Sequence, residues 1–493
     1  MAGMTFTRAT LWLALWAASG CTVAHDWPSP GSRGQDPAHR PTAAGWSGTM
    51  WAGPRSGPPA APNASDCQRA PQLIELAGPV SPQQAGLRRE LTGKARADVM
   101  PTPAAAGATA PTPALAEAKR SAADAASTSW PAPFTQAPQN IPARPAHEPV
   151  TAGVVDDNAD FGEYLSYRRR NGGLPVRDRD ISERYRLTVH DAAGRAVPDA
   201  LVSVWAGSRA QPLWARTDSG GQVWLHPRAS GVGDAVLEVR VSKISGDAEL
   251  RGMALLRRGQ RDQLQVRLDS ALPAERARLD LVFLVDATGS MGDEIDKLKR
   301  SMRSIADQVA ALPSQPQICF GLVAYRDRGD EFFVRAWDFS DDLGAFQQAL
   351  AGVRASGGGD IPEALNEALH TAVHRLSWRG DGASRLVVLV ADAPPHLDYG
   401  APWYDDDMQG ALARGIKIFA VGASGLDKTG EYIYRQMAQY TGGRFIFLTY
   451  DKANNPASGP GRETVHDVGN YSVETLDKLV VRLVRDELAK RPR

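Results

Sequence analysis

The feature that most constrains this chain is a regular alternation of apolar and amphipathic segments that begins at Leu279 and continues towards the C-terminus. Residues 279–285 (LDLVFLV) and 385–391 (RLVVLVA) are near-continuous apolar runs, which predict strands buried on both faces. Residues 293–312 instead repeat apolar side chains every three or four positions, which predicts an amphipathic helix. Strands separated by helices form a mostly parallel sheet with helices on both faces, so we expect a doubly wound α/β fold here.

The same reasoning predicts the other elements of this C-terminal domain, which we bound at residues 276–493. The expected strands are 279–285, 318–325, 331–337, 385–391, 416–421 and 444–448, and the expected helices are 293–312, 343–353, 362–376, 408–414, 431–440 and 473–488. In a sheet of this kind, ligands bind at the carboxyl ends of the strands, where the strand order reverses. A functional site is therefore expected directly after the strands.

Ahead of this domain, residues 156–275 predict a β-sandwich with a short N-terminal extension. Alternating segments at 185–189, 200–205, 222–225, 235–241 and 263–268 are separated by turns rich in Gly and Asp. The run VHDAAGRAVPDALVSVW, followed by ARTDSGGQVWL, resembles the carboxypeptidase regulatory-like, prealbumin-type sandwich of exported bacterial proteins. That resemblance implies a spacer or binding module without an active site.

The N-terminus predicts export. Arg8 precedes the apolar residues 9–18, which are too few to span a bilayer as a stable helix. The segment ends in Ala18-Ser19-Gly20-Cys21, which resembles the lipobox of bacterial lipoproteins and implies lipidation of Cys21 after removal of the signal peptide within residues 1–21. Ala18 stands where that motif most often has Leu, so an ordinary signal peptide with an incidental Cys21 is the alternative. We expect a lipoprotein of the cell envelope, on the outer membrane or its periplasmic face.

Residues 22–155 predict a disordered linker. Residues 22–150 hold 21 of the 35 prolines and no sustained apolar period, so they cannot bury enough surface to fold alone. The three cysteines, Cys21, Cys67 and Cys319, are too few for a disulfide framework, and we interpret Cys319 as a small buried side chain of a core strand. Lys plus Arg equals Asp plus Glu at 56 each, which argues against a general nucleic-acid binder.

Acidic and hydroxyl side chains gather at three places where the predicted topology puts a site. The stretch DATGS (residues 286–290) follows the first strand, GGGDIPE (357–363) precedes a helix, and DAPPH (392–396) follows the strand at 385–391. Alternate residues of an extended segment point the same way, so Asp286, Thr288 and Ser290 can converge on one cation. Neighbouring carboxylates raise one another's pKa unless a cation lies among them. Carboxylate and hydroxyl oxygens suit Mg²⁺, Mn²⁺ or Ca²⁺ better than zinc or copper.

The first stretch resembles the Asp-x-Ser-x-Ser signature of the metal-ion-dependent adhesion site in von Willebrand factor type A domains, with Thr288 in place of the first Ser. The resemblance covers about residues 279–490. It implies an open metal position that accepts an acidic side chain of a protein partner, and the metal ligands Asp286, Thr288, Ser290, Asp360 and Asp392. Asp360 stands where many members of this family have Thr. This difference, together with the motifs YRD (residues 325–327) and ADAPPH (residues 391–396), resembles a subgroup of the family.

Each acidic residue also has an alternative interpretation. Asp286 could be a polar residue at a strand end, Asp360 could cap the following helix, and Asp392 could belong to a turn. Pro362 is favoured at the first position of a helix, which would leave Asp360 free for the metal. Glu363 could reach the site, but we expect it on a solvated helix face.

Two further groups of residues do not form recognisable motifs. His370 and His374 have helical spacing, but HTAVH lacks the Glu of a zinc-protease motif, so we interpret them as surface or packing residues. His396 lies close to Asp392 in the sequence, yet no Ser occupies a G-x-S-x-G elbow.

We therefore expect a binding protein and not an enzyme: an exported, membrane-anchored receptor or scaffold that binds an unknown protein partner through a divalent cation. One alternative is a metal-assisted hydrolase that uses the same carboxylates with His396 as base. A metal-free structural module is the other.

Overall fold

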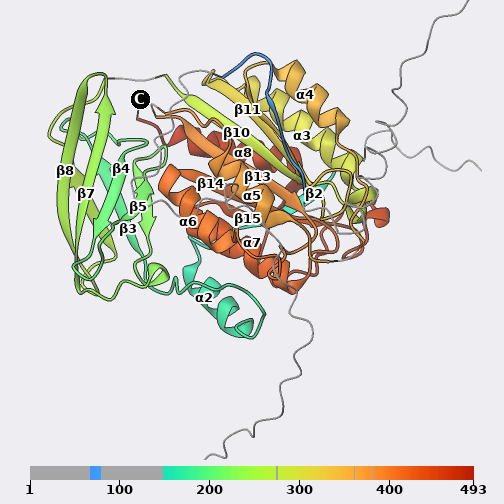
Figure 1. The fold of residues 1–493 in the computed structure, drawn as a ribbon, viewed down its shortest axis with the longest axis horizontal. Coiled ribbons are helices and arrows are strands. Elements are labelled where there is room, and N and C mark those ends of the chain that lie inside the picture. The colour runs from blue at the N-terminus through green and yellow to red at the C-terminus, as the bar shows by residue number, and fades with distance from the viewer. Residues whose placement is uncertain (1–66, 79–147, 274–275, 360, 381, 493) are drawn as a thin grey trace, which may run out of the picture. The chain divides into compact units, whose positions relative to one another are not determined.

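The computed structural model describes residues 67–78, 148–273, 276–359, 361–380 and 382–492 (Figure 1). The predicted signal peptide with Cys21, most of the predicted linker and Asp360 lie outside the described residues. In the described part of the chain, no helix is both long and apolar enough to cross a bilayer.

The C-terminal domain is built on a nine-stranded sheet. Its strands lie in the order β1 (Leu73–Leu76), β12 (Val334–Ser340), β11 (Gln317–Tyr325), β10 (Arg278–Asp286), β13 (Ser384–Ala391), β14 (Ile416–Gly422), β15 (Arg444–Thr449), β2 (Thr151–Val155) and β16 (Val473–Thr475). The five strands from β11 to β15 in this order are parallel to one another. The strand order reverses at β10, because the next strand in the chain lies on one side of it and the later strands lie on the other.

Helices cover both faces of this sheet (Figure 1). One face carries α3 (Ile295–Ala310), α4 (Leu343–Gly352) and α8 (Leu476–Ala489), and the other carries α5 (Leu365–His374), α6 (Tyr404–Arg414) and α7 (Lys428–Thr441). Alternate side chains of β10 enter the two cores: Phe283 packs with the first set of helices and Val282 with the second. The predicted α/β fold of this domain is confirmed.

Two predicted helices begin later than expected. Residues 473–475, which we predicted as the start of the last helix, form β16, and α8 begins at Leu476. We predicted a helix from Pro362, whereas α5 begins at Leu365. The backbone before α5 bonds elsewhere, because the Glu363 N–H donates to the Pro394 carbonyl (3.0 Å) and the His396 N–H donates to the Glu363 carbonyl (3.1 Å). Pro362 therefore does not occupy the first position of the helix.

Residues 185–267 form two smaller sheets. The first contains β6 (Gln222–Leu225), β3 (Tyr185–His190) and β9 (Gln263–Arg267), and the second contains β5 (Leu213–Arg216), β4 (Leu201–Trp205), β7 (Val236–Ser245) and β8 (Ala248–Arg257). We did not predict β5 or β8. The sequence of β8 does not alternate clearly, because apolar side chains also occupy its exposed face, with Met253 63% and Leu255 53% exposed.

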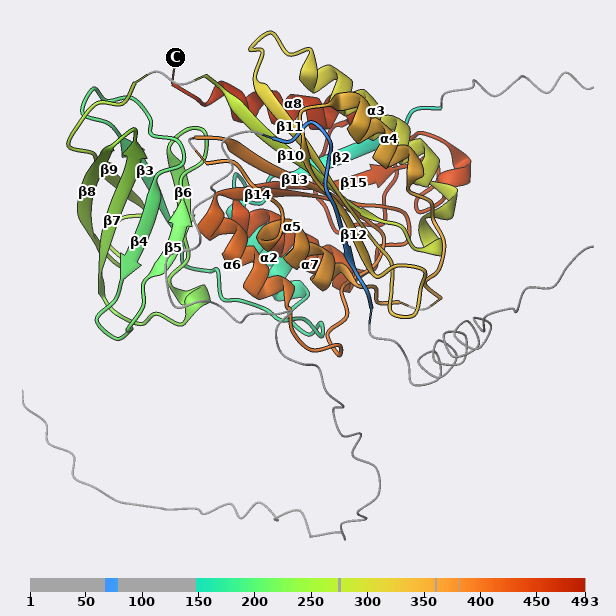
Figure 2. The same cartoon turned by 45° about the horizontal axis from the view of Figure 1, so that its top comes forward.

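Two segments of the predicted linker are strands of the large sheet. β1 pairs antiparallel with β12 at one edge, where Figure 2 shows the two strands side by side. β2 pairs antiparallel with β15 and β16 at the other side of the sheet. The prediction of a continuous linker over 22–155 is wrong for these segments, because strands of four and five residues show no sustained apolar period. The two smaller sheets are therefore an insertion between β2 and β10.

A disulfide joins the segment before β1 to a core strand. Cys67 is bonded to Cys319 of β11, with 5.9 Å between their Cα atoms. Cys319 is buried as predicted, but the interpretation of this residue as an unbonded core side chain is wrong. The bond ties the chain ahead of β1 to the neighbour of β10.

Buried charges join the inserted sheets to the α/β domain. Asp199 accepts hydrogen bonds from Arg385 of β13 (2.9 Å) and from Arg216 (3.1 Å), and Lys243 lies 3.7 Å away. Burial opposes ionisation of Asp199, but the three cations hold its pKa well below the ordinary value. Its stabilising contribution is therefore present at neutral pH and is lost as the pH falls through about 4 and below.

We predict that Asp199→Asn lowers the free energy of unfolding by about 3–5 kcal/mol, because two buried guanidinium groups lose their counter-charge. Asn tolerates the positive φ of 55° at this position, so the backbone is preserved. Urea unfolding followed by circular dichroism measures the loss. The control is Asp247→Asn in the exposed turn after β7, which should cost less than about 0.5 kcal/mol. Equal losses in the two variants would contradict the assigned role of Asp199.

A second prediction concerns the disulfide. Cys67→Ser should lower the free energy of unfolding by about 2–4 kcal/mol, since the unfolded chain then loses a long-range crosslink. A non-reduced tryptic digest of the wild-type protein should contain peptides 56–69 and 304–326 linked to each other, and reduction should separate them. Two separate peptides with free thiols in protein isolated without reductant would overturn the assignment.

Candidate functional site

The first acidic cluster begins on the last residue of β10. Asp286 is fully buried, and its carboxylate accepts hydrogen bonds from the Thr288 N–H (2.9 Å), the Thr288 hydroxyl (2.7 Å) and the Tyr325 hydroxyl (3.1 Å). The Ser290 hydroxyl lies 3.1 Å from the Thr288 hydroxyl. The three predicted ligands of this cluster therefore lie together at the carboxyl end of the central strand.

Arg326, the residue after Tyr325, fixes the backbone around this cluster. Its guanidinium is buried and donates to the carbonyls of Ala287 (3.2 Å) and Arg354 (3.1 Å). It therefore holds the first loop against the segment that leads into the second cluster. The sequence singled out this residue only through a resemblance, whereas the structure gives it a positioning role.

The second cluster approaches the first through its glycines. The Gly289 N–H donates to the Gly357 carbonyl (2.9 Å), and a Cβ atom on Gly289 would lie 2.8 Å from that oxygen. Gly358 has a φ of +66°, and a Cβ atom there would lie 2.7 Å from Glu363 Oε1. Glycine is the residue that permits this close approach. Asp360 lies outside the described residues, so its role as a ligand stays a prediction.

Glu363 faces the site, although we expected it on a solvated helix face. Its side chain is buried at 2% exposure, and Oε2 has no hydrogen-bond partner among the described residues. Burial, together with the charges of Asp286, Asp327 and other nearby carboxylates, raises the pKa of Glu363 to about 9. The expectation is wrong because Glu363 belongs to the segment that bonds to the third cluster ahead of α5.

The third cluster follows β13, the other neighbour of β10. Asp392 is buried, and its Oδ1 has no hydrogen-bond partner in the part of the chain that the structure describes. Burial raises the pKa of Asp392, even though the Ser290 hydroxyl donates to it. Burial and the charge of Asp392 together raise the pKa of Asp286 to about 7. Asp286 and Asp392 are thus close enough to repel each other.

These buried carboxyl groups fit a bound cation. Among the described residues, Asp286, Glu363 and Asp392 form no ion pair with a basic side chain. When they are ionised, their charge therefore has no partner in the described part of the chain, where two of their oxygens also lack hydrogen bonds. An arrangement of carboxylate and hydroxyl oxygens without nitrogen or sulfur suits a hard divalent cation.

His396 lies beside this site in a different set of contacts. Its Nδ1 is 2.8 Å from Asp398, its Nε2 is 3.5 Å from Asp327, and its ring stacks on Tyr399 with 3.5 Å between centroids. Although burial opposes protonation, these carboxylates raise the pKa of His396. The side chain is buried, which argues against its use as a freely accessible base.

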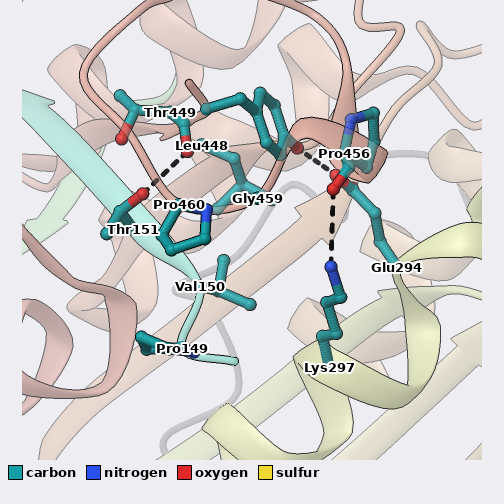
Figure 3. Close-up of a pocket in the computed structure, with 11 residues that line it drawn as sticks. Pro149, Val150, Thr151, Glu294, Lys297, Leu448, Thr449, Pro456, Gly459 and Pro460 are labelled. Atoms are coloured by element: carbon teal, nitrogen blue, oxygen red, sulfur yellow. Dashed lines mark hydrogen bonds between the residues drawn. The ribbon is translucent and has the colours of Figure 1, made fainter. Parts of the chain in front are cut away.

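A pocket opens near the site but is not lined by the predicted ligands. Residues 149–151 line one part of it, and Glu294 and Lys297 near the start of α3 line another (Figure 3). The remaining lining residues are 448–450, 456, 459 and 460. Glu294 accepts a hydrogen bond from Tyr450 at its edge, and burial raises the pKa of Glu294 to about 7. Lys297 donates to the Pro456 carbonyl (3.4 Å). The predicted ligands among the described residues therefore form a separate group from this pocket.

Comparison with known proteins identifies the type of the C-terminal domain. Residues 280–455 match the von Willebrand factor type A domain family, and this part of the chain is a domain of that type. Over 147 residues the chain is 30% identical to the alpha-protein kinase vwkA of Dictyostelium discoideum, which covers 28% of this chain and 22% of that protein. Over 138 residues it is 33% identical to human von Willebrand factor A domain-containing protein 7, covering 28% of this chain and 14% of that protein.

A third relative is human integrin beta-4, with 30% identity over 184 residues, covering 33% of this chain and 10% of that protein. The chain spans less than a quarter of the length of each of these three relatives. The similarity therefore concerns one domain and does not extend to the activities of the whole proteins.

The hydrogen bond between Tyr325 and Asp286 yields a third prediction. Tyr325→Phe should lower the free energy of unfolding by about 1.5–3 kcal/mol when Asp286 is ionised, because a buried carboxylate then loses a hydrogen-bond donor. Tyr404→Phe is the control. This tyrosine is also buried, but its hydroxyl donates to an uncharged group, the backbone carbonyl of Arg177 (2.8 Å). Its loss should therefore lower the free energy of unfolding by about 0.5–1.5 kcal/mol. Denaturant unfolding at about pH 9 compares the two, because Asp286, with its pKa raised to about 7, is then ionised. A larger loss in Tyr404→Phe would mean that Asp286 is uncharged.

Proposed function

We propose that the von Willebrand factor type A domain binds one divalent cation, Mg²⁺ or alternatively Mn²⁺ or Ca²⁺, through Asp286, Thr288, Ser290, Asp360 and Asp392, and that the bound cation captures an acidic side chain of a protein partner. The observation that carries this proposal is that buried acidic oxygens converge here and form no ion pair with a basic side chain of the described residues. A cation at this place would relieve the repulsion between Asp286 and Asp392. The match to a domain family found in an integrin supports a protein as the partner.

Glu363 adds a further acidic oxygen to this site. It lies against Gly358 of the second cluster, and one of its oxygens lacks a partner among the described residues. With Asp286, Asp360 and Asp392, it would give the site more negative charge than a divalent cation neutralises. Such a site would bind the metal tightly and leave it less attractive to an incoming carboxylate.

Export of the protein is part of the proposal. The disulfide between Cys67 and Cys319 supports it, because structural disulfides persist in oxidising compartments and are rare in reducing ones. Lipidation of Cys21 stays a prediction from the sequence. The combined proposal is a membrane-anchored receptor or scaffold of the cell envelope.

A metal-assisted hydrolase is the alternative that uses the same carboxylates. Its base would be His396, which is buried, stacked on Tyr399 and held by Asp398. These contacts favour a role in fixing the third loop over a role in proton transfer. We therefore favour the binding function.

The test is thermal unfolding of the full chain, treated with EDTA and then measured with and without millimolar Mg²⁺ or Mn²⁺. A ligand that binds only the folded state at 100 times its Kd adds about 2.7 kcal/mol of stability, so the melting temperature should rise by several degrees. Asp286→Ala should abolish the rise. Asp392→Asn should raise the melting temperature of the metal-free protein, because one repelling charge is gone, and should reduce the metal-dependent rise.

Asp247→Asn in an exposed turn of the inserted sheets is the matched control and should keep the full metal-dependent rise. The metal-site proposal fails if the wild-type protein shows no rise at millimolar metal, or if Asp286→Ala keeps it. The domain would then be a metal-free interaction module.

A further inference from the structure

A second group of side chains that could bind a metal lies between the neighbouring helices α5 and α6. His370 and His374 are one helical turn apart on α5, and Asp407 lies on the neighbouring helix α6. His370 Nδ1 and His374 Nε2 each lie 2.9 Å from the same oxygen, Oδ1 of Asp407. One ligand atom from each of the three side chains lies within 4.8 Å of the other two. The sequence interpretation of the two histidines as surface or packing residues did not foresee this grouping.

The carboxylate at the centre of this group is not fully satisfied. Asp407 is buried at 3% exposure, and its Oδ2 has no hydrogen-bond partner among the described residues. A buried carboxylate oxygen without a partner is costly, unless it binds a proton donor or a cation. The neighbouring acidic residues of α6 are already paired, because Asp405 and Asp406 both contact Arg179.

A glycine makes room for the second histidine. Gly410 lies on α6, three residues after Asp407, and a Cβ atom on it would lie 2.8 Å from both Cε1 and Nε2 of His374. The ring of His374 therefore occupies the space that any other residue would fill at this position. Glycine in the middle of a helix is unfavourable compared with alanine, so its presence here is explained by the contact and not by helix formation.

We propose that His370, His374 and Asp407 bind a divalent transition metal such as Zn²⁺. Zn²⁺ is the metal used to test this proposal. Two imidazole nitrogens and one carboxylate oxygen are ligands that Zn²⁺ accepts, at bond lengths of about 2.0–2.2 Å. Small rotations of three neighbouring side chains would bring their ligand atoms to those lengths. The His374 side chain is 29% exposed, so water can occupy the fourth position.

The bound metal would join α5 to α6. In the metal-free arrangement both nitrogens donate to one ionised oxygen, since a carboxylate only accepts. On metal binding, each neutral ring would shift its single proton to its other nitrogen, and the nitrogen that faces Asp407 would bind the metal through the lone pair thus freed. This site shares no residue with the acidic cluster at the end of β10, and the proposal does not rest on the function proposed for that cluster.

The experiment is a calorimetric titration of the full, EDTA-treated chain with Zn²⁺. Wild-type protein should bind one equivalent, and His374→Ala should weaken that binding at least tenfold. Asp286→Ala should keep it, which separates this site from the acidic cluster. His190→Ala, a half-buried histidine on β3, is the control for a general loss of histidine and should also keep it.

Gly410→Ala is the sharpest variant, because it leaves all three ligands chemically intact. The added methyl group should displace the His374 ring and weaken Zn²⁺ binding at least tenfold, while the metal-free protein stays folded, because the higher helix propensity of alanine offsets part of the lost hydrogen bond to Asp407. If the three side chains form only a structural hydrogen-bond cluster, the wild-type protein should not bind Zn²⁺. That result, or equal Zn²⁺ affinity in wild type, His374→Ala and Gly410→Ala, overturns the proposal.

Discussion

The C-terminal domain is arranged around a fully buried carboxyl group, that of Asp286 at the end of β10. Asp286 is buried and therefore needs hydrogen-bond donors from the protein, which Thr288 and Tyr325 provide. Tyr325 comes from the adjacent strand, where it pairs directly with Asp286. The loop around Asp286 is held in turn by Arg326, and the second and third loops are bonded to each other through Glu363. The strand ends are thus one interconnected unit.

The sequence predicted the elements whose pattern is dictated by burial. Parallel core strands such as β10 and β13 are buried on both faces, so their sequences are continuous apolar runs that are hard to mistake. Strands β1, at one edge of the sheet, and β2, between β15 and β16, were missed, because strands of four and five residues are too short to show a regular pattern. Strand β8 was missed for a related reason, since its apolar residues occupy both of its faces.

The candidate site was predictable to the extent that its residues follow strands. Asp286 and Asp392 come directly after β10 and β13, and topology alone brings such positions together. Glu363 was misjudged, because its burial depends on backbone bonds to a loop about thirty residues later in the chain. The group of His370, His374 and Asp407 was not foreseen, because the third residue lies on another helix and sequence spacing cannot reveal which helices are neighbours.

The disulfide also determines how mechanical load would pass through the molecule. Tension applied to the chain ahead of Cys67 would enter β11 directly through the bond to Cys319, without stretching the hydrogen bonds between β1 and β12. β11 is paired along its length with β10, which ends at Asp286. A pull between the N-terminal side and a partner held at Asp286 would therefore run through two adjacent core strands. The inserted sheets would lie outside that line of force and would stay folded under it.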